Sequence, residues 1–177
     1  MDFSYEVKIP KERVAVLVGV KGETKKKIAH ALGIKIEVDS KEADVLLEGD
    51  DSLKLLTGQN IVKAIGRGFN PEIAMELLND DNYLEIIDIE QYSGSSKSNL
   101  IRVRARAIGT GGKARKTLEE LTDTKVVVFG KTIGIIGDFE GVALARKAFE
   151  SLLMGNRHTT VYAWLEKQRK RSKSMMY

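Results

Sequence analysis

The spacing of apolar residues along the chain changes from a period of two to a period of about 3.6 and back again. Residues 5–9 alternate apolar and polar side chains, which predicts a half-buried strand. Residues 10–18 and 23–32 carry apolar positions at helical spacing, with a proline at the start of the first segment and a glycine after the second. Two short β-branched strands follow, and residues 52–66 predict a long closing helix. The predicted order is therefore βααββα.

The same order recurs in the second half of the chain. We expect a strand over residues 83–90 and helices over 99–108 and 113–121. Two strands then meet at Gly130, and a closing helix covers residues 140–153.

A Gly-x-x-Gly loop separates the two helices of each copy, at residues 19–22 and again 90 positions later at residues 109–112. In both copies an apolar residue, Ile28 or Leu118, stands six positions after the second glycine. These matches indicate one module used twice in an α+β fold. The expected divisions are a first domain at residues 1–69, a connecting segment at 70–82 with a short helix over 71–78, a second domain at 83–156, and a basic C-terminal helix and tail at 157–177.

Composition excludes several classes of protein. The chain has 177 residues and no cysteine, which rules out disulfides, thiolate metal sites and a cysteine nucleophile. Its longest apolar runs, such as residues 14–18, are too short to cross a bilayer. Residues 1–6 lack the features of a signal peptide. We expect a cytoplasmic protein without a membrane partner.

The formal net charge of +4 conceals a difference between the two halves. Residues 1–90 hold 12 Lys+Arg and 18 Asp+Glu, a net charge of −6, whereas residues 91–177 hold 17 and 7, a net charge of +10. Basic residues gathered around one loop and a tail are typical of proteins that bind polyanions, because Lys and Arg release counterions from phosphates. The alternative is a basic surface that only confers solubility.

The glycine loops have the chemistry of a phosphate site. A glycine at each end lets a sugar-phosphate chain approach where a Cβ would collide, and the amino end of the next helix offers free amides and a partial positive charge. A lone Gly-x-x-Gly is often an ordinary turn, but here it is repeated and, in the second copy, surrounded by cations. The candidate RNA-binding residues of the second copy are Ile108, Gly109, Thr110, Gly111, Gly112, Lys113, Arg115, Lys116 and Lys131. Those of the first copy are Gly19, Val20, Lys21, Gly22 and Lys25.

Three arginines on the helix before the second loop are further candidates. Arg102 and Arg106 lie four residues apart on the polar face, where they either reach phosphates or are simply solvated. Arg104 falls between two apolar stripes and is either a partly buried groove residue or an arginine whose stem extends to the surface.

The order βααββα with Gly-x-x-Gly between the helices resembles the KH domain. Residues 16–24 and 33–38 closely resemble its signature, and the copy that begins at Ala107 is more divergent. Two tandem type I KH domains with a C-terminal basic helix, over residues 4–171, are similar to the archaeal KH-domain ribosome-assembly proteins related to the eukaryotic Dim-two and partner-of-endonuclease factors. KH loops clamp about four nucleotides with the bases in an apolar groove, for which Ile108, Leu118 and Val127 are candidates here.

The resemblance implies a single-stranded RNA-binding factor rather than an enzyme, with no cofactor. It implies binding near the 3′ end of small-subunit (16S) ribosomal RNA during precursor maturation, mainly through the second domain. The implied protein partners are the pre-rRNA endonuclease and the alpha subunit of initiation factor two. A general KH-domain regulator of messenger RNA and a protein scaffold remain the alternatives.

The first copy allows two interpretations. Lys21 and Lys25 are well placed for RNA, but the strands that follow carry acidic residues that would repel a phosphate chain. The first copy is therefore expected to hold the other copy or a protein, with a weaker second RNA site as the alternative.

At the C-terminus, Val161, Trp164 and Leu165 follow helical spacing, and a basic run occupies residues 167–173. Core packing is the favoured role for Trp164, base stacking the alternative. The basic run is expected to touch phosphates when RNA is bound.

Catalytic and metal sites find no support in the sequence. Gly130, Lys131 and Thr132 imitate the end of a phosphate-binding P-loop, but Lys125 stands where that motif needs a glycine. His30, expected at the surface, and His158 have no ligand or carboxylate partner at motif spacing. We expect neither a catalytic residue nor a metal ligand.

Overall fold

The computed structural model describes residues 2–177, which form two compact units that divide between Asp80 and Asp81. This division lies within the segment predicted to connect the two copies. None of the helices formed by residues 2–177 combines the length and the apolar character needed to cross a membrane.

The first unit follows the predicted order. Its elements are β1 (Phe3–Lys8), α1 (Lys11–Val18), the 3₁₀ turn η1 (Val20–Gly22), α2 (Glu23–Leu32), β2 (Lys35–Asp39), β3 (Asp44–Gly49) and α3 (Ser52–Gly66). The connecting segment supplies α4 (Pro71–Ala74) and the 3₁₀ turn η2 (Met75–Leu78), both of which pack against α3.

Local chemistry sets the ends of these helices. Helix α2 ends at Gly33, whose φ of 63° is a left-handed conformation that glycine adopts without strain. Helix α3 begins after Asp51, whose side chain accepts hydrogen bonds from the amides of Leu53 and Lys54. Both helices have the limits predicted from the sequence.

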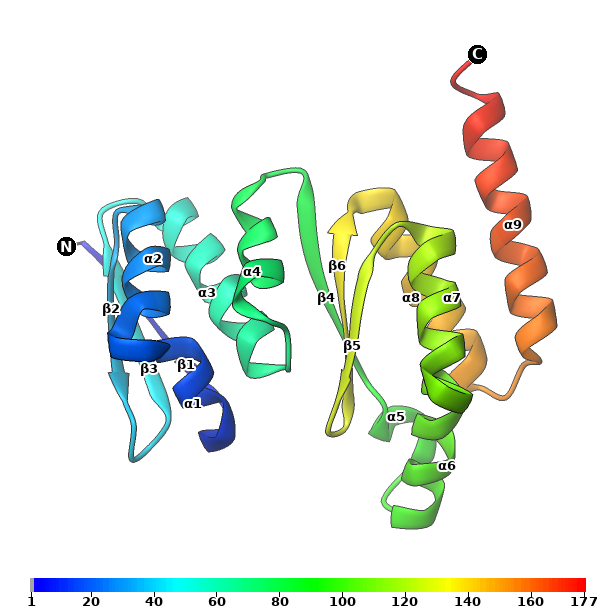
Figure 1. Cartoon of the computed structure of the whole chain (residues 1–177), viewed down its shortest axis with the longest axis horizontal. Coiled ribbons are helices and arrows are strands. Elements are labelled where there is room, and N and C mark those ends of the chain that lie inside the picture. Colours follow the sequence, from blue (N-terminus) through cyan, green and yellow to red (C-terminus); the bar gives the residue numbers. More distant parts are fainter. Residues whose placement is uncertain (1) are drawn as a thin grey trace. The chain divides into compact units, whose positions relative to one another are not determined.

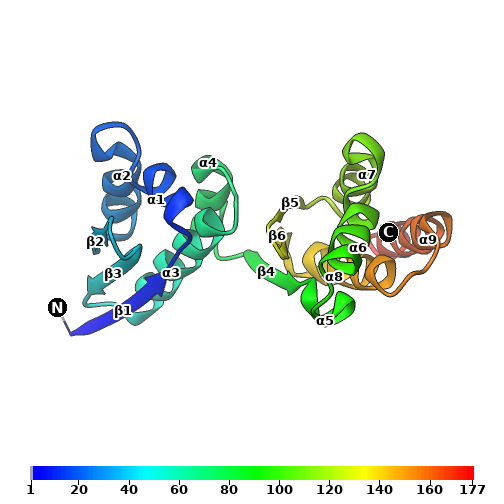
Figure 2. The same ribbon diagram turned by 90° about the horizontal axis from the view of Figure 1, so that it is seen from below.

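The first sheet has the strand order β1-β3-β2, with both pairs antiparallel. In this register Val7 lies opposite Val45, and both are buried. The three helices α1, α2 and α3 lie on one face of the sheet (Figures 1 and 2). The core therefore forms between this face and the helices, and the other face of the sheet carries polar residues.

The second unit repeats this architecture. Its elements are β4 (Asn82–Asp88), α5 (Glu90–Ser93), α6 (Lys97–Ile108), the 3₁₀ turn η3 (Thr110–Gly112), α7 (Lys113–Thr122), β5 (Lys125–Phe129), β6 (Thr132–Asp138), α8 (Phe139–Leu153) and α9 (His158–Ser174). The sheet order β4-β6-β5 matches that of the first unit, and β5 lies at its edge.

The first strand of the second unit was predicted to be too long. The strand expected over residues 83–90 ends at Asp88, and α5 begins at Glu90. The carboxylate of Asp88 accepts a hydrogen bond from the backbone N–H of Glu90 at 2.9 Å. This short side-chain bond turns the chain out of the strand, and apolar alternation does not reveal it.

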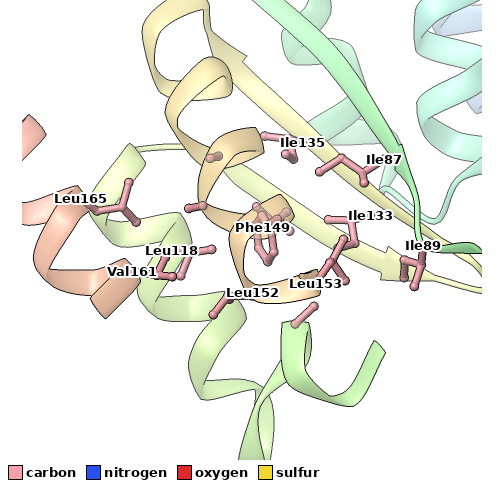
Figure 3. Packing of buried hydrophobic residues seen from close by; sticks show 14 of the residues in the cluster. Ile87, Ile89, Leu118, Ile133, Ile135, Phe149, Leu152, Leu153, Val161 and Leu165 are labelled. Carbon is pink, nitrogen blue, oxygen red and sulfur yellow. The ribbon is translucent and has the colours of Figure 1, made fainter. Parts of the chain in front are cut away.

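Phe149 of α8 is fully buried in the core of the second unit (Figure 3). Ile133 and Ile135 of β6 and Leu118 of α7 belong to the same cluster. Helix α9 packs against α7 and α8 and contributes Val161 and Leu165, which are 3% and 1% exposed. Trp164 is partly buried against this cluster, which confirms its predicted packing role.

Candidate nucleic-acid interface

The two glycine loops have nearly the same backbone. Gly19 has φ and ψ of 74° and 176°, and Gly109 has 75° and 171°. At the third loop position Lys21 has 54° and 26°, and Gly111 has 63° and 21°. A positive φ costs little at glycine but strains other residues. The second loop therefore adopts this shape with less strain than the first.

The first and last glycines of the second loop have different roles. A Cβ on Gly109 would lie 2.7 Å from the backbone nitrogen of Ala114, so this glycine is required for close packing within the protein. A Cβ on Gly112 would meet only the Nη2 of Arg115, at 3.8 Å. The side of the loop at Gly112 therefore leaves room for a ligand backbone.

The amino end of α7 is suited to an anion. No side chain caps it, and its first turn has no acidic residue. The exposed Lys113 and Lys116 flank it. Helix α2 of the first unit also lacks a side-chain cap, but it carries Glu23 in its first turn. Because a carboxylate there opposes a phosphate, the second loop is the better anion site.

Arg115 and Glu119 of α7 bind the edge of β5. Glu119 accepts a hydrogen bond from the N–H of Val126 at 2.7 Å, and Arg115 donates to the carbonyl of Val126 at 3.4 Å. The two side chains also form an ion pair at 3.0 Å. Since alternate residues of an antiparallel strand direct their backbone groups to opposite sides, those of Val128 also point away from β6.

The apolar groove predicted beside the second loop is partly wrong. Ile108 is half-buried at the end of α6, as expected. Leu118 is fully buried in the core because it lies on the inner face of α7. Val127 lies on the sheet face away from the helices, since its neighbours Val126 and Val128 are the residues that pack against the core. Val128, and not Val127, therefore lies on the sheet face that packs against the helices.

The three arginines of α6 differ in their surroundings. Arg102 is exposed, and Arg104 is half-buried with an Nε atom that is buried without a hydrogen-bond partner. Arg106 donates from Nε to the carbonyl of Leu152 at 3.3 Å and from Nη2 to that of Asn156 at 2.5 Å. Arg106 is therefore held in place by the end of α8.

Lys131 lies in the β5–β6 hairpin, away from the glycine loop in the sequence. Its ammonium group is 2.5 Å from the carboxylate of Glu90. The hydrogen bond to Glu90 raises the pKa of Lys131. A phosphate would have to compete with that carboxylate.

The candidate residues of the first unit lie on its loop and on the helix that follows. Val20 is 77% exposed at the tip of its loop, Lys21 is exposed, and Lys25 is half-buried. The outer face of its sheet is acidic, with a hollow lined in part by Glu6, Glu37, Asp39 and Asp44.

The structure also places two α9 residues, missed by the sequence analysis, beside the second loop. His158 Nε2 is 2.9 Å from the carbonyl oxygen of Arg106, and the ring of Tyr162 packs edge-on against the imidazole. Helical spacing identified α9, but it could not reveal which helix the first turns of α9 face. His30, by contrast, is exposed as expected. Among residues 2–177, no group of three or more acidic or histidine side chains is arranged to hold a metal ion.

Three comparisons identify the family. Residues 83–170 match the family described as eukaryotic type KH-domain (KH-domain type I). The chain is 45% identical to the KH domain-containing protein MJ0443 of Methanocaldococcus jannaschii, over 97% of this chain and 77% of that protein. It is 28% identical to the pre-rRNA-processing protein pno1 of Schizosaccharomyces pombe, over 94% of this chain and 71% of that protein.

A solved structure agrees with these relationships. The crystal structure of an a/eIF2alpha-aDim2p-rRNA complex from Pyrococcus horikoshii contains a chain that matches with a TM-score of 0.88 and 42% identity, over 96% of this chain and 95% of that one. The chain described here therefore belongs to the family of KH-domain proteins that includes archaeal Dim2p and the eukaryotic pre-rRNA-processing protein PNO1.

Proposed function

We propose that this protein is an RNA-binding factor in the processing of ribosomal RNA precursors. It binds a single-stranded segment near the 3′ end of small-subunit (16S) ribosomal RNA, mainly through the second unit, and has no catalytic step of its own. The relatives support this proposal because their names describe RNA-binding and pre-rRNA-processing proteins and not enzymes.

The observation that carries the proposal is the amino end of α7. It is uncapped, lacks an acidic residue in its first turn, and follows a loop in which Gly112 leaves open space for a phosphate. The corresponding helix of the first unit has Glu23 in its first turn. This contrast favours the second loop as the main RNA site.

Single-stranded RNA fits the surface beside that loop. The half-buried Ile108 and Val128 offer apolar contacts to bases. The outward backbone groups of Val128 at the edge of β5 can bond to the edge of an unpaired base. Arg104, half-buried on the same helix as Ile108, adds a positively charged side chain to this surface.

The first unit has a different task in this proposal. We infer that it too is a type I KH domain, because it shares the element order, the sheet order and the loop conformation of the second unit. Its acidic sheet face favours a protein partner over RNA. The alpha subunit of initiation factor two is the first candidate, since the Pyrococcus complex contains it, and the pre-rRNA endonuclease is the second.

Crosslinking in cells, followed by sequencing of the bound RNA, tests the proposal. We expect the crosslinks to gather near the 3′ end of small-subunit ribosomal RNA and to be lost when Thr110 and Gly111 are both replaced by Asp. Crosslinks scattered over messenger RNA would favour a general regulator. Failure of the purified protein to bind any single-stranded RNA at low salt would favour a protein scaffold.

A further inference from the structure

A hollow of about 510 Å³ lies behind the second glycine loop, between the carboxyl end of α6 and the first turns of α9. Its walls include Arg102 and Arg106 of α6, Lys113 of α7, and His158 and Tyr162 of α9. Gly109 and Thr110 of the loop complete one side. On the helical wheel of α6, Arg102 and Arg106 lie on the flank opposite Arg104 and Ile108. The hollow therefore lies on the other flank of α6 from Arg104 and Ile108.

The charged residues that line the hollow are all basic. Its lining contains three cationic side chains and no acidic one. Within the described part of the chain, neither Arg102 nor Lys113 takes part in an ion pair. A closely spaced group of unpaired cations is costly unless an anion joins it. The site is thus suited to a negatively charged ligand.

The first unit provides an internal comparison. In the 90-residue register of the two loops, Glu12, Val16 and Glu23 occupy the positions of Arg102, Arg106 and Lys113. Charge is therefore reversed at two of these positions and absent at the third. The first unit also has the short α4 after its closing helix, where the second has α9. The first unit therefore lacks the three cations that line the hollow of the second unit.

Several of its side chains are already held in place. Arg106, which lines the hollow, is positioned by its hydrogen bonds to the carbonyls of Leu152 and Asn156. His158 donates from Nε2 to the carbonyl of Arg106, so its Nδ1 stays available. The ring of Tyr162 lies 6.1 Å from the imidazole at an interplanar angle of 66°. A ligand therefore meets a surface that needs little ordering.

We propose that this hollow binds the sugar-phosphate backbone of nucleotides that continue beyond those held at the glycine loop. This inference rests on the proposed function and extends the RNA footprint across α6 onto α9. Gly109 and Thr110 belong both to the loop and to the hollow, so a strand leaving the loop enters the hollow without a gap. Its volume falls within the range of small-molecule sites, ~300–1,000 Å³, and admits one nucleotide, whose base can stack on Tyr162.

The test measures affinity as a function of RNA length. Fluorescein-labelled single-stranded RNA of degenerate sequence, four, eight and twelve nucleotides long, is titrated with the full chain and followed by anisotropy. The variants are Arg102→Glu, which installs the residue of the first copy, and Tyr162→Leu, which keeps apolar bulk. Lys97→Glu on the same helix is the control, because it makes the same change in net charge outside the hollow.

Arg102→Glu is expected to weaken binding of the eight- and twelve-nucleotide RNAs by about tenfold and that of the four-nucleotide RNA by less than about twofold. The salt slope for the longer RNAs should fall by ~0.7, the value of one phosphate contact in single strands. Tyr162→Leu should act in the same direction, and Lys97→Glu should leave all three lengths nearly unchanged.

The outcomes separate this inference from the function on which it rests. The hollow does not hold RNA if the wild type binds all three RNA lengths with the same affinity. The same conclusion follows if Arg102→Glu weakens binding equally at all lengths, or by no more than Lys97→Glu does. The proposed function would survive those results. If the wild type binds none of the RNAs at low salt, both proposals fail. The RNA assignment would also be overturned if an acidic peptide bound in the hollow and left the dependence of RNA affinity on RNA length unchanged.

Discussion

Arg13 and Arg106 bind equivalent carbonyl groups in the two units from positions one helical turn apart. Arg13 donates from Nε to the carbonyl of Ile65 at 2.8 Å and from Nη2 to that of Phe69 at 2.9 Å. Arg106 makes the same two bonds to the carbonyls of Leu152 and Asn156. These two residues have the same positions relative to the end of α8 as Ile65 and Phe69 have relative to the end of α3. Each arginine thus ties the helix before the glycine loop to the end of the closing helix.

This relationship predicts that Arg106→Ala lowers the stability of the second unit. Removing a charged donor from two carbonyls should cost about 2 kcal/mol of unfolding free energy. The chain has a single tryptophan, which is Trp164 of α9. Urea unfolding followed by its fluorescence reports on this unit. Arg106→Lys should restore only part of the loss, because lysine cannot make both bonds in the same geometry.

Arg102→Ala serves as the matched control, since Arg102 lies four residues away on the same helix and is exposed. It should change the unfolding free energy by less than about 0.5 kcal/mol. Equal stability losses for the two variants would show that the carbonyl bonds of Arg106 contribute nothing.

The two outer glycines of the second loop should respond differently to alanine. Gly109→Ala forces a Cβ to within 2.7 Å of the backbone of Ala114, so we expect a loss of more than about 2 kcal/mol of stability. Gly112→Ala meets no close atom and suffers only from its φ of 78°, at a cost of about 1 kcal/mol.

The two glycine variants should also differ in what they reveal about RNA binding. Gly112→Ala is expected to remain folded at room temperature and to bind single-stranded RNA several-fold more weakly, because its Cβ enters the space left for a phosphate. Circular dichroism and anisotropy on the same sample measure both effects. Undiminished affinity in Gly112→Ala would show that the phosphate does not approach at that glycine.

The sequence predicted the elements better than the site. The limits of α2 and α3 followed from Gly33 and Asp51, which act on the adjacent turn of backbone. Periodicity could not place Leu118 or Val127 correctly, because the face that an apolar residue presents depends on what packs against it. The partners of Arg106, 46 and 50 residues away, and the approach of His158 to α6 are likewise tertiary contacts with no local signal.

Charge placed in the second loop should abolish RNA binding. With Thr110 and Gly111 both changed to Asp, two carboxylates would meet the phosphate at the amino end of α7. The fold should persist, because a Cβ on Gly111 meets no atom within 4 Å, and the first loop accommodates Lys21 at the same backbone angles.

The matching change of Val20 and Lys21 to Asp is the control in the first unit. It should weaken RNA binding by less than about threefold, since Glu23 already disfavours an anion there. Equal losses from the two double variants would contradict a division of labour between the units.

Removing residues 167–177 should weaken binding without disturbing the core. The deletion takes away five cations of α9 but leaves Val161 and Leu165 in place. The salt slope of the affinity should fall by ~0.7 for each phosphate that the shortened helix no longer neutralises. Deletion of residues 175–177 alone removes no charged side chain and should change neither the slope nor the emission of Trp164. An unchanged slope in the longer deletion would mean that the basic run does not bind RNA.

Single-stranded RNA should bind far better than a duplex of the same sequence. The surface beside the second loop offers half-buried apolar residues, Ile108 and Val128, and the open backbone edge of β5. These features can engage only bases whose edges are free, and a paired helix hides those edges in a deep, narrow major groove. We expect a preference of at least about tenfold, or ~1.4 kcal/mol.

Charge alone predicts the opposite order. A duplex presents the denser array of phosphates, so a surface that binds only through its net charge of +10 should prefer the duplex or bind both equally. Titration of a labelled single strand and of a hairpin of the same sequence, at near-physiological salt, distinguishes the two cases. Raising the salt should weaken the hairpin more steeply than the single strand, since apolar and base-edge contacts are not screened. A hairpin that binds as tightly as the single strand would show that the basic surface, and not the apolar residues and open β5 edge beside the second loop, governs recognition.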